Sequence, residues 1–303
     1  MAKNPQNYRT NKEKRLYIEE CERRFDAEVD RAIRLITETD GLEIVTLSGP
    51  SCSGKTTTAK KLICGVEAAG RRAHVVSIDD FYRDRSEIVW KVSSDGTMKP
   101  DYESVDSIDL VAVEKFVRSM RAGSELYSPV FNFAAGCATD VRKIEYSKGD
   151  IIIFEGIQAI YPEVRALFSE FTMRSIFISV ADTLEVGGEI FLPEDIRLMR
   201  RLVRDYNYRG TLAEMTFYLW GDVRRNEIEN IEPNAANGDV KINSLLEYEV
   251  GVLKPYLFGV LGEVTSDSPY ASKANEIIER LSDIIPIPSG LIPENSVYRE
   301  FVH

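Results

Sequence analysis

The hydrophobic positions of the chain first follow a helical period and then gather into short continuous runs. Between residues 12 and 38, apolar side chains recur at near-helical spacing within a highly charged stretch: Leu16, Phe25, Val29, Ala32, Ile33 and Ile36. This spacing predicts a long amphipathic helix, whose apolar face we expect to pack on the rest of the chain or on a partner. The pair Asp40-Gly41 then marks a turn.

Strands and helices are predicted to alternate after this turn. Apolar, often β-branched runs predict strands at 42–47, 73–78, 151–154 and 174–180, and a helix is expected at 55–68. The strand runs are continuous rather than alternating, which is typical of strands that are buried on both faces. We therefore expect an α/β fold with a mostly parallel sheet flanked by helices.

Two segments between these elements are candidates for contact with a substrate. Residues at about 80–148 form an insertion that contains several aspartates, prolines and aromatic residues, and we expect a substrate-binding subdomain there. A connection at 181–196, which contains Gly187-Gly188, leads into an arginine-rich helix. We expect this helix, at about 194–212, to act as a lid.

The remaining residues define the expected domain organisation. Residues 1–40 are expected to form a helical extension, and 41–303 a single domain with a helical C-terminal part at 245–303. Within that part, the pattern predicts helices at 245–262 and 270–284. From Pro286 onward the chain is rich in proline, and we expect it to wrap the surface.

Charge and composition limit the classes of partner. Acidic residues outnumber basic ones, 49 to 38, for a formal net charge of −11, which argues against nucleic acid as a partner. No apolar run approaches the roughly 20 residues that span a bilayer, and residues 1–15 lack the apolar region of a signal peptide. The cysteines show no C-x-x-C spacing, which argues for reduced thiols in a cytoplasmic protein and against a zinc site. They are Cys21, Cys52, Cys64 and Cys137.

A phosphate-binding motif stands between the first predicted strand and the first helix that follows it. The sequence Gly49-Pro50-Ser51-Cys52-Ser53-Gly54-Lys55-Thr56 fits the pattern G-x-x-x-x-G-K-[ST]. Backbone N–H groups of such a loop and the helix N-terminus bind phosphate, the lysine reaches the β- and γ-phosphates, and the Thr56 hydroxyl can bind Mg²⁺. We expect ATP to bind at Gly49 to Thr57, with contacts from Gly49, Pro50, Ser51, Cys52, Ser53, Gly54, Lys55, Thr56 and Thr57.

Acidic residues follow two other predicted strands. Asp79 and Asp80 come directly after the second strand, and Glu155 ends the third. Ligands bind at the carboxyl ends of the strands of an open α/β sheet. A carboxylate there can accept a proton from an attacking hydroxyl or hold magnesium. We expect Glu155, and also Asp79, to contribute to a metal site, although each acid could instead cap a helix or a turn.

Arginines recur at helical spacing in the predicted lid. They are Arg197, Arg200, Arg201 and Arg204, and Arg209-Gly210 follows. Residues three, four and seven apart share one face of a helix, and guanidinium groups are suited to binding phosphate. The spacing fits a lid that closes on the transferring phosphate, and it fits equally a solvated basic face.

Four motifs in register resemble the uridine kinase and phosphoribulokinase family. They are the phosphate loop, Asp79-Asp80-Phe81-Tyr82, Phe154-Glu155-Gly156-Ile157, and Arg201-x-x-Arg204-Asp205-x-x-x-Arg209-Gly210. The resemblance covers about residues 42–243. A further stretch, from Trp220 to Leu253-Lys254-Pro255-Tyr256, is similar to a bacterial subgroup of uridine-kinase-like proteins.

The resemblance implies a P-loop kinase that uses ATP and Mg²⁺, and it implies roles for individual residues. Asp79 would be the catalytic base on the acceptor hydroxyl, with Asp80 in a lesser role. Tyr82 would line the acceptor site and Asp101 would hold ribose or polyol hydroxyls. The remaining implied roles are magnesium assistance by Glu155 and charge stabilisation in a lid by Arg201, Arg204 and Arg209, with Arg201 also near the acceptor.

One departure from the family concerns the acceptor. Uridine kinases read the pyrimidine with a tyrosine and a histidine in a stretch that resembles residues 129–136 here. Phe131 stands in place of that tyrosine and Gly136 in place of the histidine. We therefore expect an apolar, roomy pocket in which Phe131 still contacts the acceptor but the pyrimidine-reading hydrogen bonds are missing.

The function that we expect is ATP-dependent phosphorylation of a hydroxyl on a small molecule, with a nucleoside as the first choice of acceptor. A non-nucleoside polyol, sugar or sugar phosphate is the alternative. A second alternative is a non-catalytic nucleotide-binding or switch protein, although the chain has no N-K-x-D guanine-reading motif and keeps the acids and arginines of a kinase. The oligomeric state stays open, a homo-oligomer included.

Overall fold

A five-stranded parallel sheet forms the centre of the protein in the computed structural model, which describes residues 8–93 and 96–302. The strand order is β11-β8-β1-β7-β2, and each neighbouring pair is parallel. The strands are β1 (Ile44–Ser48), β2 (Ala73–Ser77), β7 (Ile151–Glu155), β8 (Met173–Ser179) and β11 (Val240–Asn243). The predicted α/β class and parallel sheet are confirmed, while the short edge strand β11 was not anticipated.

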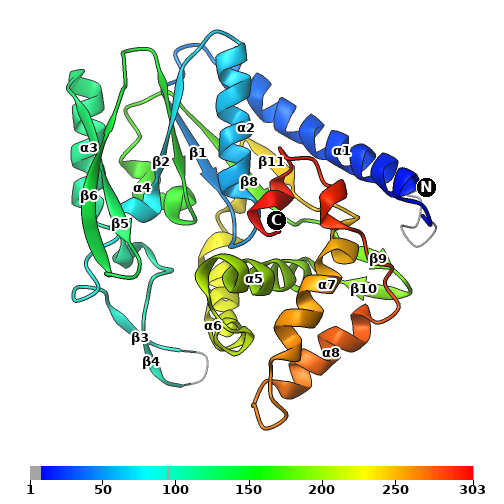
Figure 1. The fold of residues 1–303 in the computed structure, drawn as a ribbon. Coiled ribbons are helices and arrows are strands. Elements are labelled where there is room, and N and C mark those ends of the chain that lie inside the picture. Colours follow the sequence, from blue (N-terminus) through cyan, green and yellow to red (C-terminus); the bar gives the residue numbers. More distant parts are fainter. Residues whose placement is uncertain (1–7, 94–95, 303) are drawn as a thin grey trace.

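One face of the sheet is covered by the two helices nearest the N-terminus. Helix α1 (Asn11–Glu38) lies along α2 (Lys55–Ala68) and reaches β8 and β11 (Figure 1). The buried residues of α1 include Ile18, Phe25, Val29 and Ile36, so its apolar face joins the main core. The helix expected at 12–38 therefore packs on the rest of this chain, which removes the need for a partner to cover it.

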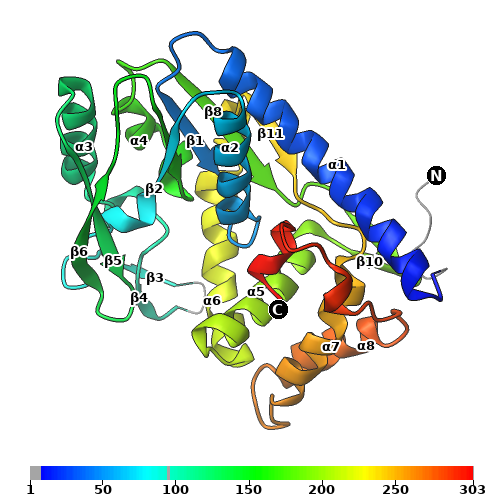
Figure 2. The ribbon, with the colours of Figure 1, turned by 45° about the horizontal axis from the view of Figure 1, so that its top comes forward.

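The insertion after β2 covers the opposite face and extends beyond the sheet. It carries α3 (Leu110–Ala122), whose apolar residues join a second core cluster with Phe81 and Phe154. It also forms two antiparallel hairpins, which lie on the side of the molecule away from α1 (Figures 1 and 2). The hairpins are β3 (Trp90–Val92) with β4 (Met98–Pro100), and β5 (Leu126–Asn132) with β6 (Cys137–Ile144). The short helix α4 (Pro162–Ala166) follows β7.

The arginine-rich segment forms α5, which is packed into the core of the protein. Its buried residues include Ile196, Met199, Leu202 and Val203, and it packs against α6 and α7. The expectation of a lid helix at 194–212 is therefore not supported, because a helix with buried side chains on several faces is an internal element rather than a movable flap. The elements around it are the hairpin β9 (Leu184–Val186) with β10 (Glu189–Phe191), α5 (Pro193–Arg209), α6 (Ala213–Asn226), α7 (Glu249–Gly262) and α8 (Ala271–Leu281).

The C-terminal segment also differs from the expected surface wrap. After α8 the chain returns to the centre of the molecule and ends beside α2 and α5 (Figures 1 and 2). Val297, Tyr298, Phe301 and Val302 are almost fully buried in the main core. Within the described ranges 8–93 and 96–302, no helix has the length and apolar character to cross a membrane.

Candidate active site

The phosphate-binding loop joins β1 to α2, as the motif predicts. Gly49 lies so close to β8 that a Cβ atom there would be 1.9 Å from the Ile178 carbonyl oxygen. Gly54 has a φ of +89° in the left-handed region that favours glycine, and Lys55 begins α2 directly after it. The two glycines thus set the narrow turn that directs the loop amides and the helix N-terminus toward one point.

Polar groups inside this loop have unfilled bonding capacity. The Ser53 hydroxyl is fully buried and has no hydrogen-bond partner in the described part of the chain. The Lys55 Nζ atom donates to the carbonyl oxygens of Gly49 and Pro50, at 3.0 Å each, so its ammonium lies over the loop. A buried donor without a partner and a cation held over the loop fit a bound phosphate chain.

Two arginines of α5 support the loop from behind. Arg200 is fully buried, pairs with Glu249 at 2.6 Å and donates to the Cys52 carbonyl oxygen at 3.1 Å. Arg197 forms a buried ion pair with Glu227 and lies 3.4 Å from the Ser51 carbonyl oxygen. These two arginines are therefore neither lid residues nor a solvated face, because they join the phosphate loop to buried acids elsewhere in the chain.

The other three arginines of this helix gather around one acid. Asp205 accepts from Arg204 at 2.7 Å and from Arg201 at 3.2 Å, and Arg209 lies 3.6 Å from it. Arg201 also lies 3.3 Å from the Ser51 hydroxyl of the phosphate loop. The structure thus places Arg201 and Arg204 beside the loop, while the exposed Arg209 contributes at its end.

The strand-end acids lie together at the carboxyl edge of the sheet. Glu155 pairs in register with Leu47 of β1 and with Ser77 of β2, so it stands between the phosphate loop and Asp79. Burial raises the pKa of the Glu155 carboxyl to about 7, against the opposing effect of Lys55. Burial also raises the pKa of Asp79, with Lys55 and Arg209 acting in the lowering direction. Asp79, Glu155 and Lys55 therefore share one electrostatic environment.

The neighbouring aspartates have different surroundings. The Asp79 Oδ1 atom is buried and lacks a hydrogen-bond partner among the described residues. Asp80 accepts from the Phe131 amide at 3.2 Å and pairs with Arg142 at 3.1 Å, which ties it to the β5–β6 hairpin. Asp80 is thus occupied in holding the insertion, while Asp79 has an acceptor atom available toward the site.

Asp101 and Glu103, two residues apart, have different surroundings. The Asp101 carboxylate caps a turn, accepting from the Glu103 and Ser104 amides at 3.1 Å, and pairs with Lys91 at 2.5 Å. Burial raises the pKa of the partly buried Glu103 carboxyl to about 7, with Arg201 opposing this shift and Asp79 adding to it. The sequence signal for Glu103 was its place two residues after Asp101 in the same motif, and spacing alone could not choose between them.

Aromatic side chains form a wall next to Asp79. Tyr82 lies at its centre, with ring centroids 5.5 Å from Phe131, 5.7 Å from Tyr102 and 5.9 Å from Phe133. Its hydroxyl donates to the Tyr102 carbonyl oxygen at 2.7 Å and lies 3.0 Å from the Gln158 amide nitrogen. The predicted residues Tyr82 and Phe131 therefore lie together, but the Tyr82 hydroxyl already has protein partners.

The space beside Gly136 is occupied by a charged side chain. A Cβ atom at Gly136 would lie 2.6 Å from the Nε atom of Arg85. The Arg85 guanidinium donates to the Phe133 carbonyl oxygen at 2.8 Å and lies 3.4 Å from the Tyr102 hydroxyl. The expectation of an apolar, roomy pocket here is wrong, because an arginine fills the position at which a side chain of residue 136 would project.

The polar residues beside the phosphate-binding loop fit a magnesium ion in the number of oxygen ligands that they supply. The Thr56 hydroxyl is exposed at the first turn of α2, and Glu155 and Asp79 are the acids that face the loop. Among the described residues, no group of three or more His, Cys, Asp or Glu side chains is arranged to hold a metal ion. Mg²⁺ is commonly bound by one or two protein oxygens together with water and substrate phosphates, and Thr56 with Glu155 can supply that number.

The chain is similar to a family of known proteins. The model of a family described as "Phosphoribulokinase / Uridine kinase family" matches residues 44–250. A uridine kinase from Staphylococcus aureus is 24% identical over 201 residues, which cover 66% of this chain and 86% of that protein. "Uridine-cytidine kinase B" from Dictyostelium discoideum is 24% identical over 204 residues, covering 66% and 73% of the two chains. A solved structure of a possible uridine kinase from Bacillus stearothermophilus covers 72% of this chain and 98% of its own, with 20% identity and a TM-score of 0.42.

Proposed function

The chain belongs to the phosphoribulokinase/uridine kinase family, and from this premise we propose the groups that carry out its phosphoryl transfer. The reaction is transfer of the γ-phosphoryl group of ATP to a hydroxyl of a small molecule. The observation that carries the proposal is the buried Oδ1 atom of Asp79, which has no partner in the described part of the chain and faces the region of Lys55 and Glu155. A carboxylate in that position can accept the proton of an acceptor hydroxyl.

The remaining roles follow from which groups border the phosphate loop. The Lys55 ammonium now donates to the carbonyl oxygens of Gly49 and Pro50. When the nucleotide binds, it donates to the β- and γ-phosphates instead. Arg201 and Arg204 donate to the transferred group, and Arg209 adds positive charge near Asp79. Thr56 and Glu155 would hold Mg²⁺, which would neutralise charge on the phosphates.

We assign the acceptor hydroxyls to Glu103 in place of Asp101. The charges of Asp79 and Arg201 both act on the pKa of the Glu103 carboxyl. The Asp101 carboxylate, in contrast, accepts from a backbone amide of its own turn and pairs with Lys91. Phe133, an exposed ring of the aromatic wall around Tyr82, offers an apolar face that suits a nucleobase. A nucleoside that binds with its base on this wall and its 5′-hydroxyl toward Asp79 is the first candidate.

A second candidate is favoured by Arg85. Its guanidinium lies beside the aromatic wall and can only donate hydrogen bonds. It therefore favours an acceptor molecule that carries an anionic group or a carbonyl oxygen. A polyol, sugar or sugar phosphate that carries such a group fits this end of the site. Uridine and cytidine fit less well, because Phe131 lacks a hydroxyl and the histidine position is a glycine beside Arg85.

The acceptor is identified by steady-state kinetics on uridine and cytidine beside purine nucleosides, inositols and sugar phosphates. We expect the two pyrimidine nucleosides to be poor substrates. A kcat/KM for uridine above roughly 10⁴ M⁻¹s⁻¹ would contradict this expectation. Arg85→Ala should lower kcat/KM for an anionic acceptor much more than for a neutral nucleoside, so the variant distinguishes the two candidates.

The nucleotide assignment is tested separately with two lysine variants. Lys55→Ala should weaken ATP binding and nearly abolish turnover, because the ammonium over the loop is lost. Lys60→Ala, at an exposed position of the same helix, is the matched control and should behave like the wild type. A non-catalytic switch protein would bind ATP but would give no product with any alcohol, which separates that alternative from a kinase.

A further inference from the structure

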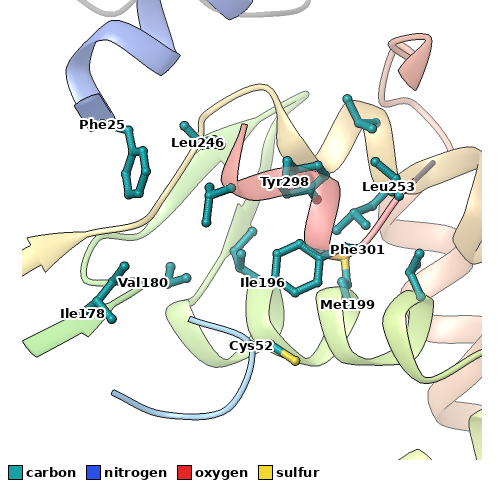
Figure 3. Packing of buried hydrophobic residues seen from close by; sticks show 14 of the residues in the cluster. Phe25, Cys52, Ile178, Val180, Ile196, Met199, Leu246, Leu253, Tyr298 and Phe301 are labelled. Carbon is teal, nitrogen blue, oxygen red and sulfur yellow. The ribbon is translucent and has the colours of Figure 1, made fainter. Parts of the chain in front are cut away.

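The C-terminal segment Ser296–Val302 forms part of the wall around the phosphate-binding loop. A Cβ atom at Gly54 would lie 2.4 Å from a methyl carbon of Val297, so this glycine makes room for the segment as well as for the turn. The turn Val297–Glu300 also packs on α2. Figure 3 shows Tyr298 and Phe301 pointing into the cluster that contains Cys52 of the loop and Met199 of α5.

Polar contacts fix the segment at both sides of this cluster. The Arg200 guanidinium, which donates to the Cys52 carbonyl oxygen, lies 5.8 Å from the Tyr298 ring centroid and 5.3 Å from that of Phe301. The Asn207 side chain donates to the Phe301 carbonyl oxygen at 3.2 Å. One fully buried cation therefore holds both the loop and the segment, and the segment is an ordered component of the site.

This placement brings one carboxylate to the loop. The Thr57 hydroxyl lies 3.5 Å from the Glu300 Oε2 atom, at the outer limit of a hydrogen bond. Glu300 is partly buried, and its charge adds to the raised pKa of Arg204; burial acts against this rise, and Cys52 and Asp205 contribute more to it. It also contributes to the raised pKa of Glu155, after burial and Asp79. Glu300 is thus directed toward the nucleotide side of the candidate active site.

The chemistry of a carboxylate limits what it can bind there. A phosphate-binding loop holds the α- and β-phosphates with its amides, and Thr57 lies in the first turn of the helix that follows. A carboxylate repels phosphate, but it accepts hydrogen bonds from hydroxyl groups, and acids bind ribose hydroxyls in other nucleotide sites. In a nucleotide, the group that follows the α-phosphate is the sugar, which carries two hydroxyls.

We propose that Glu300 is a nucleotide-recognition residue, which accepts hydrogen bonds from the sugar hydroxyls of the bound nucleotide. Its long contact with Thr57 is exchanged on binding: the Thr57 hydroxyl turns to phosphate and Glu300 turns to the sugar. The C-terminal segment Ser296–Val302 positions this carboxylate. The inference rests on the proposed function, because it requires that the loop binds a nucleoside triphosphate.

The test is calorimetric binding of ATP, 2′-deoxy-ATP, 3′-deoxy-ATP and 2′,3′-dideoxy-ATP, in the absence of any acceptor. Glu300→Ala should weaken ATP binding by about 10- to 100-fold, the value of one or two charge-assisted hydrogen bonds. The wild type should bind the dideoxy analogue correspondingly weakly, and Glu300→Ala should change that affinity little. Glu294→Ala, which removes an exposed acid just before this segment, is the matched control and should bind all four nucleotides like the wild type.

Other outcomes would overturn the proposal in distinguishable ways. Equal weakening of ATP and dideoxy-ATP would show that Glu300 acts on the fold or on the phosphates, and a loss confined to buffers with Mg²⁺ would assign it to the metal. Tighter ATP binding by Glu300→Ala would show repulsion of the phosphates. Glu300→Gln, whose stability is checked by thermal unfolding, guards against a folding defect. It should lose less ATP affinity than Glu300→Ala, and its affinity for dideoxy-ATP should not change. Failure of the wild type to bind any of the four would contradict the proposed function itself.

Discussion

Replacement of Arg200 by methionine tests the support of the phosphate-binding loop. The Arg200–Glu249 pair is fully buried, with contacts of 2.6 and 2.9 Å, and the same guanidinium donates to the carbonyl oxygens of Cys52 and Ser244. Arg200→Met leaves the Glu249 carboxylate buried without its cation. Removal of one partner from such a pair costs about 3–5 kcal/mol of unfolding free energy.

This cost is large enough to be measured by thermal unfolding. At about 2–4 °C per kcal/mol for a chain of this size class, Arg200→Met should lower Tm by on the order of 10 °C. Removal of both charges by adding Glu249→Leu should recover most of the loss, because no unpaired buried charge then remains. Chemical unfolding in urea gives the free energies directly.

A surface pair provides the control. Arg118 and Glu114 form an exposed i, i+4 ion pair at 2.6 Å, and Arg118→Met should cost less than about 0.5 kcal/mol. If Arg200→Met costs no more than Arg118→Met, or if the double variant is as unstable as Arg200→Met alone, the account of α5 as a buried support of the loop is wrong.

Three further predictions concern the chemistry. Asp79→Asn should lower kcat by on the order of 10² to 10⁴ while Asp80→Asn costs much less in steady-state kinetics, and the reverse ranking would assign the base to Asp80. Burial raises the pKa values of Glu155 and Glu103 to about 7, and the proposed roles require both residues as carboxylates. The value of kcat/KM should therefore fall as the pH drops through about 7. A flat profile from pH 6 to 8 would contradict this. The same shifts favour the protonated folded state, so without nucleotide the unfolding free energy should decrease as pH rises from about 4.5 to about 7. Arg204→Lys should impair kcat because it keeps the charge but loses the planar donor fork, and a fully active variant would exclude a role in transfer.

The central sheet could be predicted from sequence because each strand carries its own signal. The runs that became β1, β2, β7 and β8 are continuous and apolar, and the loop after β1 is defined by its glycines. Strand β11 was missed because Val240–Asn243 is short and contains a lysine, so its burial depends on β8 and not on its own pattern.

The roles of the arginines could not be predicted, because their partners are distant in the sequence. Arg197 meets Glu227 30 residues away, and Arg200 meets Glu249 49 residues away. Helical spacing predicts that both arginines lie on the same face of the helix. Spacing alone does not show whether they form buried ion pairs or bind phosphate. The same holds for Arg85, which occupies the space beside Gly136 only once the insertion has folded.

The position of the C-terminal segment shows the same limit. Its prolines suggested a surface path, but Tyr298 and Phe301 are buried against Arg200, and this contact draws the segment toward the phosphate-binding loop. The apolar residues of the segment are too few to form a helical or strand pattern. Their burial depends on contacts with α2 and with residues of α5, which local sequence does not reveal.

The most direct test of phosphoryl transfer to a hydroxyl is acceptor-dependent conversion of ATP, followed by mass spectrometry of the products. Purified protein with ATP and Mg²⁺ is incubated with a panel of nucleosides, inositols, sugars and sugar phosphates. At least one alcohol should accelerate ADP formation and gain one phosphoryl group in equal amount, and Asp79→Asn should slow both by on the order of 10² to 10⁴. Slow ATP hydrolysis that no alcohol accelerates, with no phosphorylated product, would contradict this.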